Sequence, residues 1–168
     1  RDLHSFPTRR SSDLSELADG ATYALDIAGK KTADGTNIGI YKFSASENQK
    51  FMITQNSDGT YKIRTKITDE KSAVSDLGAS KENGGNVQQY TINGVNCQDW
   101  IFEPVSDLGV DMNTSVLYTF KNANSSLVMD IVNAKMENGT NVQQYDSNGL
   151  NCQKWVLKSF GNGYYYIR

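Results

Sequence analysis

Three copies of one sequence unit make up most of this chain, and they restrict its fold more than any other feature. The middle of each copy reads (D/N)G(T/G)N(I/V)xxY, and each copy ends in Gln-x-aromatic. The copies lie at 23–53, 73–102 and 127–157. The step from the tyrosine to the final aromatic residue is 10 in each of them, from 41 to 51, from 90 to 100 and from 145 to 155. A repeat kept at this spacing predicts one structural unit that packs against its own copies.

The second copy departs from this pattern by one residue in its first loop. The step from the aspartate to the final aromatic residue is 25 in the first and third copies (26 to 51 and 130 to 155) and 24 in the second (76 to 100). Ser75, and not Asp76, therefore keeps the regular spacing in the second copy.

Strand patterns dominate the rest of the sequence. Alternating β-branched and aromatic residues at 61–64, 117–120 and 165–168 indicate half-buried strands, and we find no stretch with a convincing helical period. Tight turns with positive φ are predicted at Asp58-Gly59, Asn83-Gly84, Asn93-Gly94, Asn138-Gly139 and Asn148-Gly149. Each repeat thus offers about four short strands, too few to bury an apolar face alone. We predict an all-β fold in which three repeats surround a pseudo-threefold axis, with the Gln-x-aromatic residues meeting at the centre.

We predict one domain over residues 15–168, preceded by a tail at 1–14. The tail, RDLHSFPTRRSSDL, resembles the conceptual translation of a sequencing adapter. On that interpretation the true N-terminus is lost, and the absence of a signal peptide says nothing about localisation. Within the domain we place the repeats at about 19–57, 58–107 and 108–160, followed by a closing strand at 161–168.

The strand set is irregular at its ends. The first repeat has no Tyr-x-Ile strand before it, whereas residues 164–168 supply such a strand after the third repeat. Either that last strand fills the vacant position, or the chain is a fragment cut across neighbouring units whose closure is improvised. We favour the second alternative.

Composition excludes several function classes. The chain is 38% hydrophobic and 21% charged, too apolar for disorder, and no apolar run approaches the ~18 residues of a spanning helix. A net charge of −2 provides no basic field for phosphates, so we expect neither a nucleic-acid nor a membrane partner. Two cysteines and the single His4 are too few for a disulfide framework, a zinc site or imidazole catalysis. We therefore expect no enzyme activity, no catalytic residues, no metal and no cofactor.

The repeats resemble ricin B-type lectin domains, which are also classed as family 13 carbohydrate-binding modules. The features that carry the resemblance are the three Gln-x-aromatic ends, the Leu-Asp-Ile and Met-Asp-Ile strands and Asn-Val-Gln-Gln-Tyr, and it covers about 19–168. It implies a β-trefoil of three Q-x-W repeats that binds carbohydrate of the galactose, xylose or arabinose type. The repeats are most similar to appended modules of bacterial glycan-processing enzymes, which implies a secreted or cell-surface location and fusion to a larger protein.

The resemblance also implies which residues contact the sugar. A carboxylate or amide would bind vicinal hydroxyls, and a tyrosine on the same strand face would stack on the ring. In the third repeat the candidates are Asp130, Gln143, Tyr145, Asn151 and Gln153. The family has Asn directly before the Gln of Gln-x-Trp, where this chain has Cys152, with Asn151 one position earlier.

The other two repeats keep different parts of the set. The second offers Asp76, Gln88 and Tyr90, with Cys97 in the Asn position. The first offers Asp26, Tyr41, Asn48 and Gln49, with Gly39 where the others have Gln and Phe51 where they have Trp. We rank the third site first and the other two as comparable.

Each of these residues also has a structural interpretation. The end aromatics are expected in the core, the glutamines beside them to hold backbone, and the two cysteines to be buried free thiols. The aspartates could brace a turn, and the tyrosines could cover the sheet. Adjacent Asp69 and Glu70 are not a glycosidase pair, because neighbouring side chains of an extended chain point apart.

Two function classes follow from these interpretations. The first is non-catalytic carbohydrate binding by a module appended to a secreted glycan-active protein. The second is a β-trefoil protein-interaction or protease-inhibitor domain that acts through its loops. We favour the first, since loop-based inhibition does not require Asp, Gln and Tyr to recur at matching positions.

Overall fold

The computed structural model describes residues 23–105 and 116–168, which form an all-β structure as predicted. The strands are β1 (Tyr23–Ile27), β2 (Thr36–Lys42), β3 (Phe51–Gln55), β4 (Tyr61–Thr65), β5 (Ser72–Asp76), β6 (Gly85–Thr91), β7 (Asp99–Pro104), β8 (Leu117–Asn122), β9 (Val128–Ile131), β10 (Thr140–Tyr145), β11 (Trp155–Gly161) and β12 (Tyr164–Ile167). The proposed tail at 1–14 and the residues at 108–115 of the third repeat lie outside the described ranges.

Short 3₁₀ turns connect the strands and occur at matching places in the repeats. They are η2 (Ala28–Lys30), η3 (Glu47–Gln49), η4 (Lys66–Thr68), η5 (Leu77–Ala79), η6 (Asn96–Gln98), η7 (Val132–Ala134) and η8 (Asn151–Gln153). The glycines of the five predicted Asn-Gly and Asp-Gly turns all have positive φ, between 73° and 88°. No helix in the described ranges is both long and apolar enough to cross a membrane.

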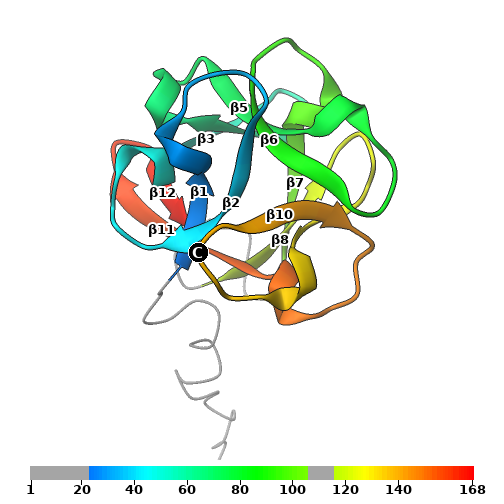
Figure 1. Cartoon of the computed structure of the whole chain (residues 1–168). Coiled ribbons are helices and arrows are strands. Elements are labelled where there is room, and N and C mark those ends of the chain that lie inside the picture. Colours follow the sequence, from blue (N-terminus) through cyan, green and yellow to red (C-terminus); the bar gives the residue numbers. More distant parts are fainter. Residues whose placement is uncertain (1–22, 106–115) are drawn as a thin grey trace, which may run out of the picture.

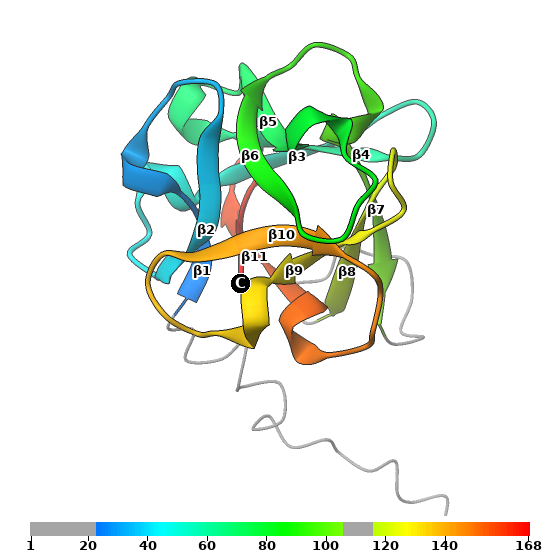
Figure 2. The same cartoon turned by 45° about the vertical axis from the view of Figure 1, so that its right-hand side comes forward.

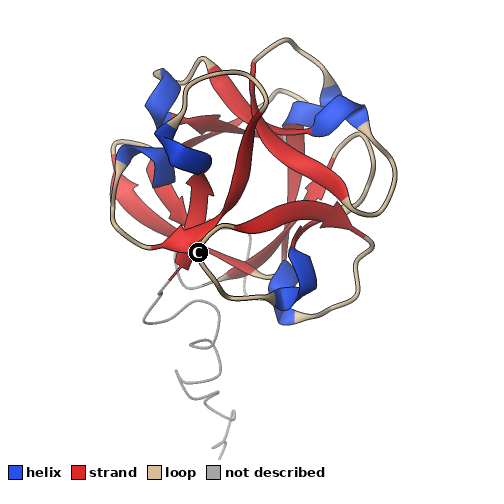
Figure 3. Ribbon diagram, viewed as in Figure 1, coloured by secondary structure: helices blue, strands red, loops and turns tan. Residues whose placement is uncertain are grey.

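Six strands form a closed barrel, in which β3 pairs with β4, β4 with β7, β7 with β8, β8 with β11, β11 with β12, and β12 with β3. The hairpins β1–β2, β5–β6 and β9–β10 cover one end. Strands β2, β6 and β10 pair with one another and form a triangle at the centre of the view (Figures 1 and 3). The arrangement is the predicted β-trefoil with pseudo-threefold symmetry.

Strand β12 occupies the position that is vacant before the first repeat. It pairs with β11 and β3, just as β4 pairs with β3 and β7, and β8 with β7 and β11. The turned view places β12 and β11 together behind the cap (Figure 2). Of the two alternatives for the strand set, the structure therefore has the regular closure and not the improvised one that we favoured.

The three end aromatics meet in one core, as predicted. Phe51 and Trp100 are 0% exposed, Trp155 is 2% exposed, and all three belong to the same apolar cluster. Each indole nitrogen also has a buried partner: Trp100 Nε1 donates to the Val74 carbonyl at 3.0 Å, and Trp155 Nε1 donates to the Met129 carbonyl at 3.2 Å. The aromatic residues thus join the cap to the barrel without leaving a buried donor unpaired.

Three asparagines close a hydrogen-bonded ring where β2, β6 and β10 meet. Asn37 Nδ2 donates to Asn141 Oδ1 at 2.8 Å, Asn141 Nδ2 to Asn86 Oδ1 at 2.9 Å, and Asn86 Nδ2 to Asn37 Oδ1 at 3.0 Å. Each amide donates once and accepts once within the ring. This ring explains why the asparagine after Gly-Thr or Gly-Gly recurs in every copy.

The turn before each of these strands reaches the next repeat. The side-chain oxygens of three turn residues accept main-chain N–H bonds at 2.6 to 2.8 Å: Asp34 from Thr91, Asn83 from Asp146, and Asn138 from Lys42. Each acceptor residue is followed by a glycine, and each donor residue directly follows the tyrosine that recurs in every copy. These hydrogen bonds therefore link each repeat to the next in a closed cycle, beside the three tyrosines that the sequence analysis named as candidate site residues.

Candidate functional site

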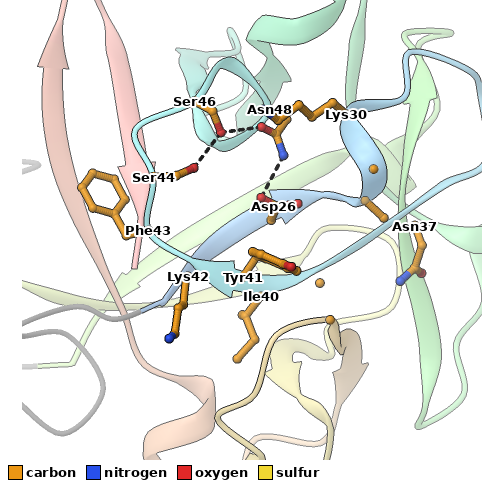
Figure 4. A pocket seen from close by; sticks show the side chains of 14 residues that line it. Asp26, Lys30, Asn37, Ile40, Tyr41, Lys42, Phe43, Ser44, Ser46 and Asn48 are labelled. Atoms are coloured by element: carbon orange, nitrogen blue, oxygen red, sulfur yellow. Dashed lines mark hydrogen bonds between the residues drawn. The ribbon is translucent and has the colours of Figure 1, made fainter.

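A cavity of about 500 Å³ lies beside Tyr41 in the first repeat, and we call it the Asp26 hollow (Figure 4). Its lining includes Asp26, Gly29, Lys30, Tyr41 and Asn48 of the first repeat and Gly139 of the third. Strand β1 supplies the aspartate, β2 the tyrosine, and turns η2 and η3 the remaining first-repeat residues of that set. The hollow is thus built where two repeats meet.

The Asp26 carboxylate is held from one side and open on the other. Asn48 Nδ2 and Gln49 Nε2 donate to its Oδ2 at 2.8 Å and 2.9 Å, and among the described residues none donates to Oδ1. Burial raises the pKa of Asp26, while the bonds from Gln49 and Asn48 and the charge of Lys30 oppose that rise. A fixed carboxylate with one available oxygen suits a hydroxyl-bearing ligand.

Glycine is the reason why this hollow is open. Asp26 faces Gly39 across the β1–β2 hairpin, whereas Asp130 faces Gln143 and Ser75 faces Gln88 in the other two hairpins. A Cβ at Gly39 would lie 2.7 Å from the Thr140 carbonyl oxygen, so the close approach of β10 leaves room for no side chain. The absence of the glutamine leaves space above Asp26 that Gln143 takes in the third repeat.

The third repeat brings its predicted residues together. Gln143 Nε2 donates to Asp130 Oδ1 at 2.9 Å, and Gln153 Nε2 donates to Asp130 Oδ2 at 3.0 Å. The Cys152 thiol also donates to Oδ2, at 3.4 Å, and burial, together with the nearby Asp130, raises its pKa to about 11. Both carboxylate oxygens are engaged by protein donors here, so a ligand would meet Gln143 and Tyr145 first.

Asn151 does not join this group. Its side chain is exposed and accepts a bond from Lys154 Nζ at 3.3 Å, while Cys152 takes the position that Asn48 holds against Asp26. Both cysteines are buried free thiols, as expected.

The glutamines of the Gln-x-aromatic ends hold backbone, as their structural interpretation predicted. Gln49, Gln98 and Gln153 each donate to the carbonyl of the residue after the tyrosine and accept an N–H two residues further on. Gln49 and Gln153 also support the aspartate from below. They shape the site and are at most 1% exposed themselves.

The second repeat separates its aspartate from the other candidates. Ser75 is in register with Gln88, and Asp76 is in register with Val87 on the opposite strand face. Asp76 is 1% exposed, and neither of its oxygens accepts a hydrogen bond from the described residues. Burial raises its pKa to about 6, and the nearby Ser80 main chain opposes this rise without forming a hydrogen bond of ordinary geometry.

The tyrosines predicted to stack on a sugar are the exposed part of all three sites. Tyr41 is 47% exposed, Tyr145 40% and Tyr90 38%. The sequence ranked the third site first because it keeps Asp, Gln and Tyr at the regular spacing, whereas the structure gives the first repeat the cavity of about 500 Å³. Sequence reasoning missed the contribution of Gly139 and of the lysines at this hollow. The recurring (D/N)G of the motif was the available signal for the glycine.

Comparison with known proteins identifies the chain. The model of ricin-type β-trefoil lectin-like domains matches residues 17–90 and 96–168. The chain belongs to this family. A search of curated proteins found no match to this ricin-type domain.

Solved structures have a similar fold. A designed threefold-symmetric protein, ThreeFoil, is 29% identical with a TM-score of 0.75, over 83% of this chain and 93% of that one. An exo-β-1,3-galactanase from Clostridium thermocellum is 23% identical with a TM-score of 0.70, over 82% of this chain and 30% of that one. The Rhizoctonia solani agglutinin is 22% identical with a TM-score of 0.65, over 80% and 90%. The last two show the fold alone.

Within the described ranges of this ricin-type domain, no group of three or more His, Cys, Asp or Glu side chains is placed to hold a metal ion.

Proposed function

We propose that this domain binds carbohydrate without catalysing a reaction on it. The observation that carries the proposal is the Asp26 hollow, where a fixed carboxylate with one available oxygen lies beside the exposed Tyr41. The carboxylate would accept hydrogen bonds from vicinal hydroxyls, and the tyrosine ring would cover the apolar face of the pyranose. In the third repeat, where both Asp130 oxygens are engaged, Gln143 and Tyr145 provide a second polar and aromatic pair.

The comparisons support this proposal at the level of the family. The matched family is one of lectin-like domains, and one similar structure is an agglutinin. The match that covers 30% of a galactanase chain supports a further step, in which the domain is appended to a larger, secreted or cell-surface glycan-active protein. Bacterial origin and glycans of the galactose, xylose or arabinose type belong to the same proposal.

Binding at any one of these sites is expected to be weak. A shallow site that contacts one or two sugar rings binds in about the millimolar range, and several sites on one rigid body gain through avidity. The physiological ligand is therefore expected to be a polysaccharide or a dense glycoconjugate and not a free monosaccharide.

The test is a glycan array followed by titration calorimetry on the best ligand, with Asp26→Asn, Asp130→Ala and the double variant. We expect each single change to lower the affinity of its site about 10-fold or more, because Asp26→Asn removes a charge-assisted hydrogen-bond acceptor and Asp130→Ala removes the carboxylate that positions Gln143. Asp69→Asn, at an exposed loop position, is the matched control and should leave binding unchanged.

Unchanged glycan binding in the double variant, or no binding of any glycan by the folded wild-type domain, would contradict the proposal. The first result would place the bound glycan outside these two sites, and the second would favour the alternative of a protein-interaction or protease-inhibitor domain that uses its loops.

A further inference from the structure

The three repeats differ in charge around their tyrosines, although their backbones match. At the third position of the turn after the aspartate strand, the first repeat has Lys30 where the others have Ala79 and Ala134. Directly after the tyrosine, the first repeat has Lys42, where the second has Thr91 and the third Asp146. The lining of the Asp26 hollow therefore includes two cationic side chains.

The other two sites each have an acidic residue beside the tyrosine. Asp34 bonds to Thr91 beside Tyr90, and Asp146 lies directly after Tyr145. At the Asp26 hollow the corresponding residue from the neighbouring repeat is the neutral Asn138. At the position beside the tyrosine, the second and third sites thus have an aspartate, and the first has Lys42 and the neutral Asn138.

Turn geometry places Lys30 over the hollow. Lys30 has a φ of 56°, close to the 51° of Ala79 and the 52° of Ala134, so the turn is shared and only the side chain differs. The Lys30 side chain runs beside Asn48 near Asp26, whereas Lys42 extends from β2 on the other side of Tyr41, away from Asp26 (Figure 4). The charge of Lys30 also opposes the rise that burial causes in the pKa of Asp26.

Both lysines remain available to a ligand. Each is exposed, and neither forms an ion pair with the residues that the structure describes. Gly39 adds room at the same place, since no glutamine side chain stands across from Asp26. One Asp and two Lys leave a local excess of positive charge in a space large enough for a substituent on the sugar ring.

We propose that the Asp26 hollow selects a saccharide that carries a negative charge, either the carboxylate of a uronic acid or a sulfate ester, while the second and third sites take neutral sugars. Asp26 would bind hydroxyls, Tyr41 would stack on the ring, and Lys30 on one side of Tyr41 or Lys42 on the other would pair with the anionic group. This inference rests on the proposed carbohydrate-binding function and specifies the ligand of its first site.

The test compares a galacturonic acid trimer, a galactose trimer and galactose 6-sulfate by titration calorimetry at low and high salt. All variants are made in the Asp130→Ala chain, so that the Asp26 hollow dominates. We expect the acidic trimer to bind more tightly than the neutral one, with a difference that shrinks at high salt. Lys30→Gln and Lys42→Gln should each weaken acidic-ligand binding about 2- to 5-fold and leave neutral-ligand binding unchanged. Lys71→Gln, at an exposed lysine outside the hollow, is the control.

The outcomes separate this inference from the function on which it rests. A lysine-dependent preference for the uronate, for the sulfate or for both supports it and identifies the charged group. Equal affinities for the acidic and neutral ligands that do not respond to Lys30→Gln overturn it, and the proposed function stands if Asp26→Asn still removes binding. Binding that ignores Asp26→Asn overturns both.

Discussion

At the scale of single residues, the buried carboxylate of Asp76 shows what a one-residue deletion does in a strand. Because side chains alternate between the faces of a strand, the shortened loop places Ser75 in the site and turns Asp76 to the other face. There the carboxylate is 1% exposed and has no hydrogen-bond partner among the described residues. A charge in that position destabilises the folded state.

The Asp76 carboxyl should therefore make stability depend on pH. Its pKa is raised from 3.8 to about 6 by burial, so the folded state holds a proton that the unfolded state has lost between these values. The contribution of the Asp76 carboxyl to the free energy of unfolding is greatest below about pH 4, and it is lost as the pH rises through about 6. We expect Asp76→Asn to raise the free energy of unfolding at pH 7 by about 2 kcal/mol and to flatten its dependence between pH 4 and 6.

Urea denaturation across this pH range measures the effect, with Asp69→Asn as the exposed control. Parallel stability curves for wild type and Asp76→Asn would show that the carboxyl is solvated in the folded state.

The direction in which each side chain points also explains which site residues could be predicted from the sequence. Asp130, Gln143 and Tyr145 were predicted to share a site, and the structure brings Asp130 and Gln143 into hydrogen-bond contact. Asn151 was chosen for its chemistry, but the turn η8 directs Cys152 at the aspartate instead. A substitution at a fixed turn position is read correctly only when the direction of each side chain is known.

At the scale of elements, the approach of β10 to β2 fixes the shape of the first site. The strands meet at Gly39, where a Cβ would contact the Thr140 carbonyl oxygen at 2.7 Å. We expect Gly39→Ala to lower the free energy of unfolding by about 1–3 kcal/mol, because backbone on both strands must move apart.

Thermal and urea unfolding measure this loss, and amide chemical shifts at Thr140 report the local displacement. Gln143→Ala, at the equivalent position of β10, already has space for a Cβ and should cost no more than about 1 kcal/mol. Equal losses in the two variants would remove the steric explanation.

Elements defined by local signals were predicted well, and those defined by distant contacts were not. Strand alternation and the Asn-Gly turns depend on a few neighbouring residues, and both are found in the structure. The position of β12, the asparagine ring and the approach at Gly39 each depend on residues from different repeats. A single repeat carries no information about them until the threefold arrangement is built.

At the scale of the whole molecule, β12 completes the barrel from the far end of the chain. Ile167 is 0% exposed within the shared core, and the Arg168 main chain exchanges hydrogen bonds with Val156 at 2.7 Å and 2.9 Å. Tyr164 Oη also donates to the Glu70 carboxylate, in the loop between β4 and β5. The last strand is therefore bound to both the first and the second repeats.

We expect Ile167→Ala to lower the free energy of unfolding by about 2–4 kcal/mol, and deletion of 164–168 to abolish cooperative unfolding. Circular dichroism during thermal unfolding measures both effects. Leu150→Ala removes a similar side chain that is 57% exposed, and its effect should stay within about 0.5 kcal/mol. A cooperative transition that survives the deletion would show that the barrel does not need its closing strand.

The cyclic interlocking of the repeats also determines the directions in which the domain can attach. The three candidate sites, which are related by the pseudo-threefold axis, face three different directions. One straight glycan strand therefore cannot contact all of them at once. Simultaneous occupation instead requires separate strands, or branches, that approach from different directions. A domain of this shape would cross-link several polymer strands, and the strength of its binding would depend on how closely those strands are packed.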